Sequence, residues 1–261
     1  MKTRAAIILI AFLYLTSCEK VVYVDLNTTD PKLVVEGNLS DQPGPYIVSL
    51  THSVNYYDPD IFPAVSGAHL VISDNAGNSE TLTEVSPGKY QTNTLQGVTG
   101  RTYSLKISAD GKQFDASSTM PSHVPIDSVN FQLNNNGNSY RVICKFKDPE
   151  GVQNFYKLQL SSNDTAGLDT TDVRILADGF ADGQELSITY RTHLLPGDSV
   201  NVKLECIDNS IYTFYRTLAD DEGGIRSFVS APPANPVTNV SNGGFGYFSA
   251  YSVAIVSTVV H

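Results

Sequence analysis

The sequence predicts a mainly β protein made of two β-sandwich domains, and three observations support this fold class. Short segments rich in β-branched and aromatic residues recur along most of the chain, which is typical of stacked antiparallel sheets. Gly, Pro, Asn and Asp separate these segments, in stretches such as "DQPGP", "DNAGN" and "SPGK". A single stretch near residues 209–222 instead has the apolar spacing of a helix.

Residues 1–17 have the pattern of a secretory signal peptide. Lys2 and Arg4 precede "AAIILIAFLYL", an apolar run that is too short to span a bilayer. The run ends in Leu15-Thr16-Ser17-Cys18, which resembles the lipobox of bacterial lipoproteins. In such proteins the cysteine thiolate takes up diacylglycerol and the chain is cut before it. We expect Cys18 to be lipidated; the alternative is an ordinary signal peptide followed by a chance cysteine.

Residues 18–31, "CEKVVYVDLNTTDP", are predicted to be a lipidated tether that leads into the first strand. Two or more acyl chains hold a protein durably on a membrane, whereas one chain holds it only marginally. We therefore expect the protein to sit on a membrane through its N-terminal lipid without crossing it.

Residues 32–121 are predicted to form an immunoglobulin-like or prealbumin-like sandwich, because their length and strand spacing are those of such domains. The stretch "GKYQTNTLQGVTGRTYSLKIS" resembles the part of these modules in which a tyrosine-bearing strand leads into the next strand. The predicted strands are "KLVVEGNLS", "YIVSLTHSV", "AHLVISD", "SETLTEV", "KYQTNTL", "TYSLKISAD" and "KQFDASSTM". The proline-containing stretch "PSHVPIDSV" is a stiff connection and marks the expected boundary.

Residues 122–261 are predicted to form a second β-rich domain with one helix. Its strands are "SVNFQLN", "YRVICKFKD", "NFYKLQLSS", "DVRILAD", "ELSITYRT", "DSVNVKLECI" and "YFSAYSVAIVSTVV". The helix is indicated by four apolar residues at i, i+3, i+4 and i+7, which are Ile211, Phe214, Tyr215 and Leu218. Asn209 or Ser210 is expected to cap its start.

The charge balance excludes some classes of partner. The chain has 27 acidic and 17 basic residues, with a formal net charge of −10 and no basic run. Nucleic-acid binding depends on neutralising phosphates, so we expect no nucleic-acid partner. Docking on anionic lipid by charge is excluded for the same reason. The acidity favours solubility or, as the alternative, cationic ligands.

Two cysteines remain besides Cys18. Cys144 in "YRVICKF" and Cys206 in "VNVKLECI" each share a strand face with apolar residues, so both sulfur atoms should point into a core. An exported protein meets oxidising conditions, in which a Cys144–Cys206 disulfide can form. The alternative is two separate buried thiols that pack as small apolar side chains.

The order of several stretches resembles a family of Bacteroidota lipoproteins known as domain of unknown function 4249. They are "CEKVVYVDLNTTDPKLVVEGNLS", "SGAHLVISDNAG", "GRTYSLKIS", "FKDPEGVQNFYKL", "LADGFADGQ" and "ANPVTNVSNGGFGYFSAYSV". The resemblance implies a lipid-anchored protein of the outer membrane, in genomes where such proteins accompany TonB-dependent receptors. It implies no activity. Both the periplasmic face and the cell surface remain open as the location.

The remaining motifs do not indicate catalysis. "NGGFGYF" lacks the Lys-Ser/Thr of a phosphate-binding loop, and "DGFADG" lacks the ligand order of an EF-hand, so each is predicted to be a turn or loop. The five histidines have no metal-ligand spacing and G-x-S-x-G is absent. We expect no metal, no cofactor and no enzymatic activity. A hydrolase with a site assembled from distant residues is the less favoured alternative.

One loop, "HSVNYYDPDIFPAVSG", is the best candidate for a partner-binding segment. Tyrosine gives a large contact area at a low entropy cost, as in antibody loops. Alternatively, the loop folds over the end of the sandwich and buries its own aromatic residues. The candidate binding residues are Tyr56, Tyr57, Asp58, Asp60 and Phe62. The expected function is that of a non-enzymatic accessory in TonB-dependent nutrient uptake, with a surface adhesin or structural scaffold as the alternative.

Overall fold

The computed structural model describes residues 30–55, 61–135, 137–163, 169–179, 181–221 and 235–261. Over these residues the protein is mainly β with one α-helix, so the predicted fold class is confirmed. The predicted signal peptide, Cys18 and most of the tether lie outside the described residues. Within the described part of the chain, no helix has the length and apolar character needed to cross a membrane.

One continuous sheet of eight strands runs through the whole molecule, in the order β12-β11-β14-β15-β1-β2-β6-β5. The strands from the first half of the chain are β1 (Leu33–Ser40), β2 (Ile47–His52), β5 (Thr83–Ser86) and β6 (Lys89–Gln91). Those from the second half are β11 (Phe155–Asn163), β12 (Asp169–Ala177), β14 (Ser199–Ile207) and β15 (Phe245–Val259).

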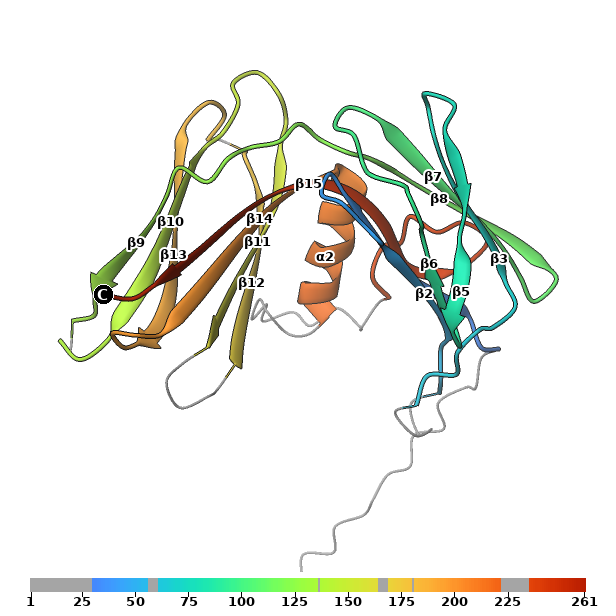
Figure 1. Cartoon of the computed structure of the whole chain (residues 1–261), viewed down its shortest axis with the longest axis horizontal. Helices are drawn as coiled ribbons and strands as arrows, with labels where there is room; N and C mark the ends of the chain where they lie inside the picture. Colours follow the sequence, from blue (N-terminus) through green and yellow to red (C-terminus); the bar gives the residue numbers. More distant parts are fainter. Residues whose placement is uncertain (1–29, 56–60, 136, 164–168, 180, 222–234) are drawn as a thin grey trace, which may run out of the picture.

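Two smaller sheets cover one face of this large sheet and complete two sandwiches (Figure 1). The first, in the order β4-β3-β7-β8, consists of β3 (His69–Asp74), β4 (Ser79–Thr81), β7 (Thr102–Ala109) and β8 (Lys112–Thr119). The second, in the order β13-β10-β9, consists of β9 (Ser128–Leu133), β10 (Tyr140–Lys147) and β13 (Glu185–Leu194). Each sandwich has its own core, because alternate side chains of the strands point between the layers.

The turns follow the sequence closely. The β7–β8 hairpin closes at Asp110 and Gly111, whose φ angles are 53° and 71°. Positive φ at both central positions is the conformation of a type I′ turn, which suits Asp-Gly and matches the twist of the two strands.

The last strand, β15, joins the two sandwiches. Its beginning pairs in parallel with β1, from Val34–Phe245 to Ser40–Tyr251, and its end pairs antiparallel with β14, from Cys206–Ser252 to Ser199–Val259. Phe248 therefore lies in the first core, whereas Val260, just past the strand, lies in the second. Strand β15 thus lies between β14 and β1 and links the two halves of the eight-stranded sheet.

The helix α2 (Asn209–Asp221) begins directly after β14, and its existence and position were predicted. Its cap differs from the prediction, because Asp208 and not Asn209 or Ser210 accepts the hydrogen bond. The Asp208 Oδ1 atom accepts from the Ile211 N–H at 3.0 Å, while Oδ2 accepts from the Ser118 hydroxyl at 2.7 Å. Asp208 therefore ties the start of α2 to strand β8 of the first sandwich.

Buried tyrosines and thiols should limit stability at high pH. Burial raises the pKa of Tyr215 from its ordinary 10.0 to about 12, and raises that of Cys206 from 9.0 to about 11. The folded state therefore holds these protons more tightly than the unfolded state, so the stabilisation is complete below pH 9 and is lost as the pH rises through 11 to 12. In urea titrations we expect a constant midpoint from pH 7 to 9 and a steep decline above pH 10. An unchanged midpoint at pH 11.5 would contradict these assignments.

Candidate functional site

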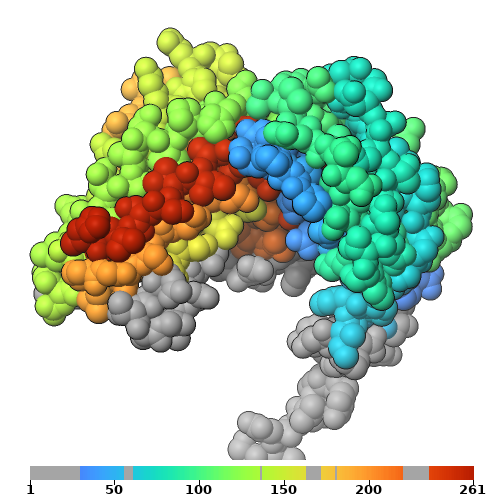
Figure 2. Space-filling model, viewed as in Figure 1, coloured from blue at the N-terminus to red at the C-terminus, as the bar shows by residue number. Residues whose placement is uncertain are grey.

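The face of the eight-stranded sheet that points away from both cores is the candidate site, and we call it the concave face. The molecule is arched, with the two smaller sheets outside and α2 inside the arch (Figure 1). The space-filling view shows the molecule hollowed on this inner side, between the two sandwiches (Figure 2). Among the described residues, α2 covers the middle of the concave face, where it packs against β11, β12 and β15.

Strand register sets which side chains reach the concave face. Neighbours across β11, β14 and β15 form one row of Lys157, Glu205 and Val253 and a second row of Gln159, Lys203 and Ile255. The other half of the sheet contributes Glu36, Ser49 and Lys89. Because side chains alternate along a strand, the residues between these positions fill the two cores. The concave face is therefore mixed, with charged, polar and exposed apolar groups side by side.

A buried ion triad lies at the centre of the second half of the concave face. The Glu205 carboxylate accepts from Lys203 Nζ at 2.6 Å through Oε1, and lies 3.1 Å from Lys157 Nζ through Oε2. Glu205 is only 3% exposed, so its charge depends on these two partners. Burial lowers the pKa of Lys203, but the Glu205 charge outweighs it and the pKa is raised. Two ammonium groups on one carboxylate leave a net positive charge at this point of an acidic protein.

Tyrosines surround the triad. Lys157 Nζ lies 4.7 Å from the centre of the Tyr215 ring, and Lys203 Nζ lies 5.1 Å from that of Tyr251. The Tyr215 and Tyr247 hydroxyls are 2.9 Å apart. Burial raises the pKa of each of these tyrosines, so all three are protonated at neutral pH. They cannot act as bases, and they pack between α2 and the sheet, where Tyr247 and Tyr251 are each 8% exposed.

The sequence analysis did not single out this triad. The signal was present in "VNVKLECI", where Lys203 and Glu205 alternate with the core residues Val202, Leu204 and Cys206. Charged residues on the second face of a strand normally face solvent. The register of β11 brings Lys157 beside Glu205, and the packing of α2 covers the charged groups.

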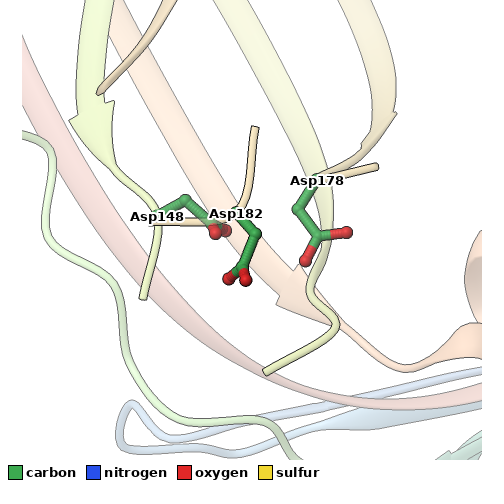
Figure 3. Close-up of side chains that lie close together, drawn as sticks. All are labelled: Asp148, Asp178 and Asp182. Carbon is green, nitrogen blue, oxygen red and sulfur yellow. The ribbon is translucent and has the colours of Figure 1, made fainter. Parts of the chain in front are cut away.

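Three aspartates form a second cluster, in which one carboxylate oxygen of each lies within 4.8 Å of the others (Figure 3). Asp178 and Asp182 belong to the "DGFADG" loop, while Asp148, which the sequence analysis missed, follows β10. Carboxylate oxygens are suitable ligands for calcium. However, these oxygens already accept hydrogen bonds from neighbouring loops. The donors are the Tyr156 hydroxyl and Gly183 N–H for Asp148, the Asn154 and Gly179 N–H groups for Asp178, and the Gly151 N–H for Asp182. The cluster thus holds two loops together, and we assign no ion to it.

A polar hollow of about 690 Å³ lies on the first sandwich and is lined by residues that include Asp74, Glu80 and Arg101. Asp74 accepts from Arg101 Nη1 at 2.7 Å. Burial opposes ionisation of Asp74, but hydrogen bonds from Asn78 and Arg101 outweigh it and hold its pKa at about 2. Glu80 accepts from the Thr94 N–H and hydroxyl. The charged groups of this hollow bond within the fold, and its lining includes none of the exposed large apolar side chains of the described residues, so it is a weaker candidate than the concave face.

The predicted binding loop is described only in part. Tyr56, Tyr57, Asp58 and Asp60 lie outside the described residues, as does Cys18. Phe62 is 56% exposed and its neighbour Ile61 is 77% exposed. Both lie at the end of the first sandwich, whereas the concave face lies along its inner side.

Cys144 and Cys206 are both buried in the second core and are separate thiols in the structure. Cys144 lies on β10 of the smaller sheet and Cys206 on β14 of the large sheet. Burial raises the pKa of each to about 11, so neither is ionised at neutral pH.

Thiol labelling checks whether Cys144 and Cys206 stay unpaired in the exported protein. In the Cys18→Ser variant we expect iodoacetamide to label neither cysteine in the folded state at pH 8, because a buried thiol with a raised pKa is unreactive. Both should react after unfolding without a reductant. If the unfolded protein reacts only after reduction, the two cysteines form a disulfide.

Comparison with known proteins gives one family match. The chain matches the profile of the family described as "Domain of unknown function (DUF4249)" over residues 19–255. A comparison with curated proteins found no match. Solved structures of low similarity include a two-domain fibronectin type III segment of chicken tenascin (15% identity, 68% of this chain and 91% of that chain, TM-score 0.22). A second is the adhesin InvE of Yersinia pseudotuberculosis (19% identity, 69% of this chain and 56% of that chain, TM-score 0.22). A third is CBD12 from CALX1.2 (10% identity, 86% of this chain and 100% of that chain, TM-score 0.23).

Proposed function

This chain belongs to the DUF4249 family, and on that premise we propose that it is a lipid-anchored binding protein of the outer membrane. Its role is non-enzymatic. Lipid on Cys18 holds the protein on the membrane, and the concave face binds a partner protein. A TonB-dependent receptor is the proposed partner, which would make the chain an accessory of nutrient uptake.

The single observation that carries the binding role is the open concave face. The opposite face of the same sheet is covered by a second layer in both sandwiches. On the concave face, Ile255 is 53% exposed and Val173 is 46% exposed, and Gln159 and Lys203 lie between them in the same row. A protein–protein interface combines apolar contacts at its centre with polar contacts at its rim, and this row offers groups of both kinds.

The membrane anchor is tested by the Cys18→Ser variant expressed in the native organism. We expect the wild-type chain to fractionate with outer membranes and to begin at a diacylated Cys18 in mass spectrometry. The variant should lose nearly all of its membrane association, because no acyl chain is then attached. A wild-type chain with a free thiol at position 18, or with residues 1–17 retained, would contradict the anchor.

The proposed partner is tested by affinity purification of the lipidated chain from detergent-solubilised outer membranes. Recovery of a TonB-dependent receptor, and its loss when Val173 and Ile255 are both replaced by aspartate, is the expected result. Recovery of no transporter, together with binding to host or matrix polymers, would instead favour the adhesin or scaffold.

A further inference from the structure

Two exposed apolar side chains lie where the N-terminal tether joins the fold. Ile61 is 77% exposed and Phe62 is 56% exposed, and they are adjacent in the chain. Neither belongs to the concave face or to either core. Two adjacent large apolar side chains that are mostly exposed form a small apolar patch, and moving such a patch out of water is favourable.

Backbone hydrogen bonds fix the position of this pair next to the tether. The Ser53 N–H donates to the Lys32 carbonyl at 2.9 Å, and the Lys32 N–H donates to the Ser53 hydroxyl, also at 2.9 Å. The His52 N–H donates to the Pro63 carbonyl at 2.8 Å. Phe62 therefore directly precedes Pro63, which bonds to the end of β2. Ser53, next to that end, bonds to Lys32, the residue before β1.

We propose that Ile61 and Phe62 insert into the lipid interface and form a second membrane contact beside the N-terminal anchor. This inference rests on the proposed lipidation of Cys18. Lys32 is the fourteenth residue after Cys18, and a chain of fourteen residues reaches at most about 50 Å. The lipid therefore keeps Lys32 within about 50 Å of the bilayer, a reach that lets this end of the first sandwich touch the membrane, and the apolar pair is the part of that end suited to enter it.

The chemistry of the pair suits a lipid interface. Phenylalanine and isoleucine gain free energy when they leave water for the boundary between headgroups and acyl chains. The side chains of the pair carry no charge, and the neighbouring His52 Nε2 and Asp110 Oδ2 atoms bond to each other at 2.8 Å. The contact is therefore apolar, and we expect it to be insensitive to salt and to the fraction of anionic lipid.

The protein has no tryptophan, so a single introduced tryptophan reports on one position alone. The probe is Phe62→Trp in the lipidated full protein, reconstituted in vesicles of pure phosphatidylcholine or phosphatidylethanolamine without other proteins. We expect the emission to shift toward the blue on reconstitution. It should also lose most of its intensity when the lipids carry brominated acyl chains.

Val98→Trp is the matched control, because Val98 is 43% exposed at the opposite end of the same sandwich. The adjacent Gly97 N–H donates to the carbonyl of Ser40, the last residue of β1. Eight residues of strand place that end about 25 Å from Lys32. We expect the emission of this control to be unaffected by vesicles or bromine.

The outcomes separate this inference from the proposed function. If mass spectrometry shows lipid on Cys18 but the tryptophan at position 62 keeps its water-exposed spectrum in vesicles, the second contact is wrong and the anchor stands. If that tryptophan is shielded only in native outer membranes, its partner is a protein, which also overturns the lipid contact. If Cys18 carries no lipid, both proposals fall.

Discussion

Replacing Gly246 by alanine is expected to destabilise the protein strongly, because this residue lies where β15 pairs with β1. Gly246 has a φ of 83° and is the partner of Val35. A Cβ atom at position 246 would lie 1.9 Å from the Val35 carbonyl oxygen, which is far inside van der Waals contact. Left-handed backbone alone costs a non-glycine residue about 1–2 kcal/mol. With the clash added, we expect a loss of at least about 4 kcal/mol in the free energy of unfolding.

Gly243→Ala is the control for the clash. Gly243 has a φ of 71°, but a Cβ atom there would meet nothing within 4 Å. This variant should therefore lose only the backbone cost of about 1–2 kcal/mol. Urea denaturation followed by circular dichroism measures both. Equal losses for the two variants would contradict the close parallel pairing of β15 with β1.

The second large effect is expected at the ion triad. Glu205→Gln removes the buried charge that Lys157 and Lys203 share and leaves two ammonium groups close together. Removing one partner of a buried pair typically costs about 3–5 kcal/mol, and because the lysines are partly exposed we expect about 3 kcal/mol. Urea denaturation at pH 7 gives this difference.

Glu185→Gln is the matched control for Glu205→Gln. Glu185 pairs with Lys145 at 2.8 Å, but both side chains are exposed, by 56% and 38%. An exposed pair of this kind contributes between 0 and about 1 kcal/mol. If Glu205→Gln cost no more than Glu185→Gln, the triad would be a surface feature and the central packing of α2 would be wrong.

Local structure could be predicted from the sequence because local chemistry determines it. The segments with period-two patterns form strands, and the Asp-Gly hairpin closes as expected. Ile211 and Phe214 lie on the buried face of α2. The path of β15 could not be predicted in this way. Its residues have an ordinary strand pattern, and nothing in that pattern says that the first half pairs with β1, more than 200 residues earlier in the chain.

The candidate site could not be predicted from the sequence for the same reason. Lys157, Lys203 and Glu205 come from two strands that meet only through antiparallel register, so no spacing along the chain brings them together. Asp148 joins Asp178 and Asp182 by a similar long-range contact. The helix cap at Asp208 is a local feature, but its second bond to Ser118 is not. Sequence reasoning therefore favoured the aromatic loop over the concave face.

Site-specific photo-crosslinking in living cells tests the central claim, that a membrane-anchored protein binds its partner through the concave face. A photoreactive residue replaces Ile255 on that face, and in a separate variant it replaces Leu133, which is 47% exposed on β9 of the outer layer. We expect position 255 to give one discrete adduct with an outer-membrane transporter and position 133 to give none. Adducts of the same kind from both positions, or none from position 255, would contradict the claim.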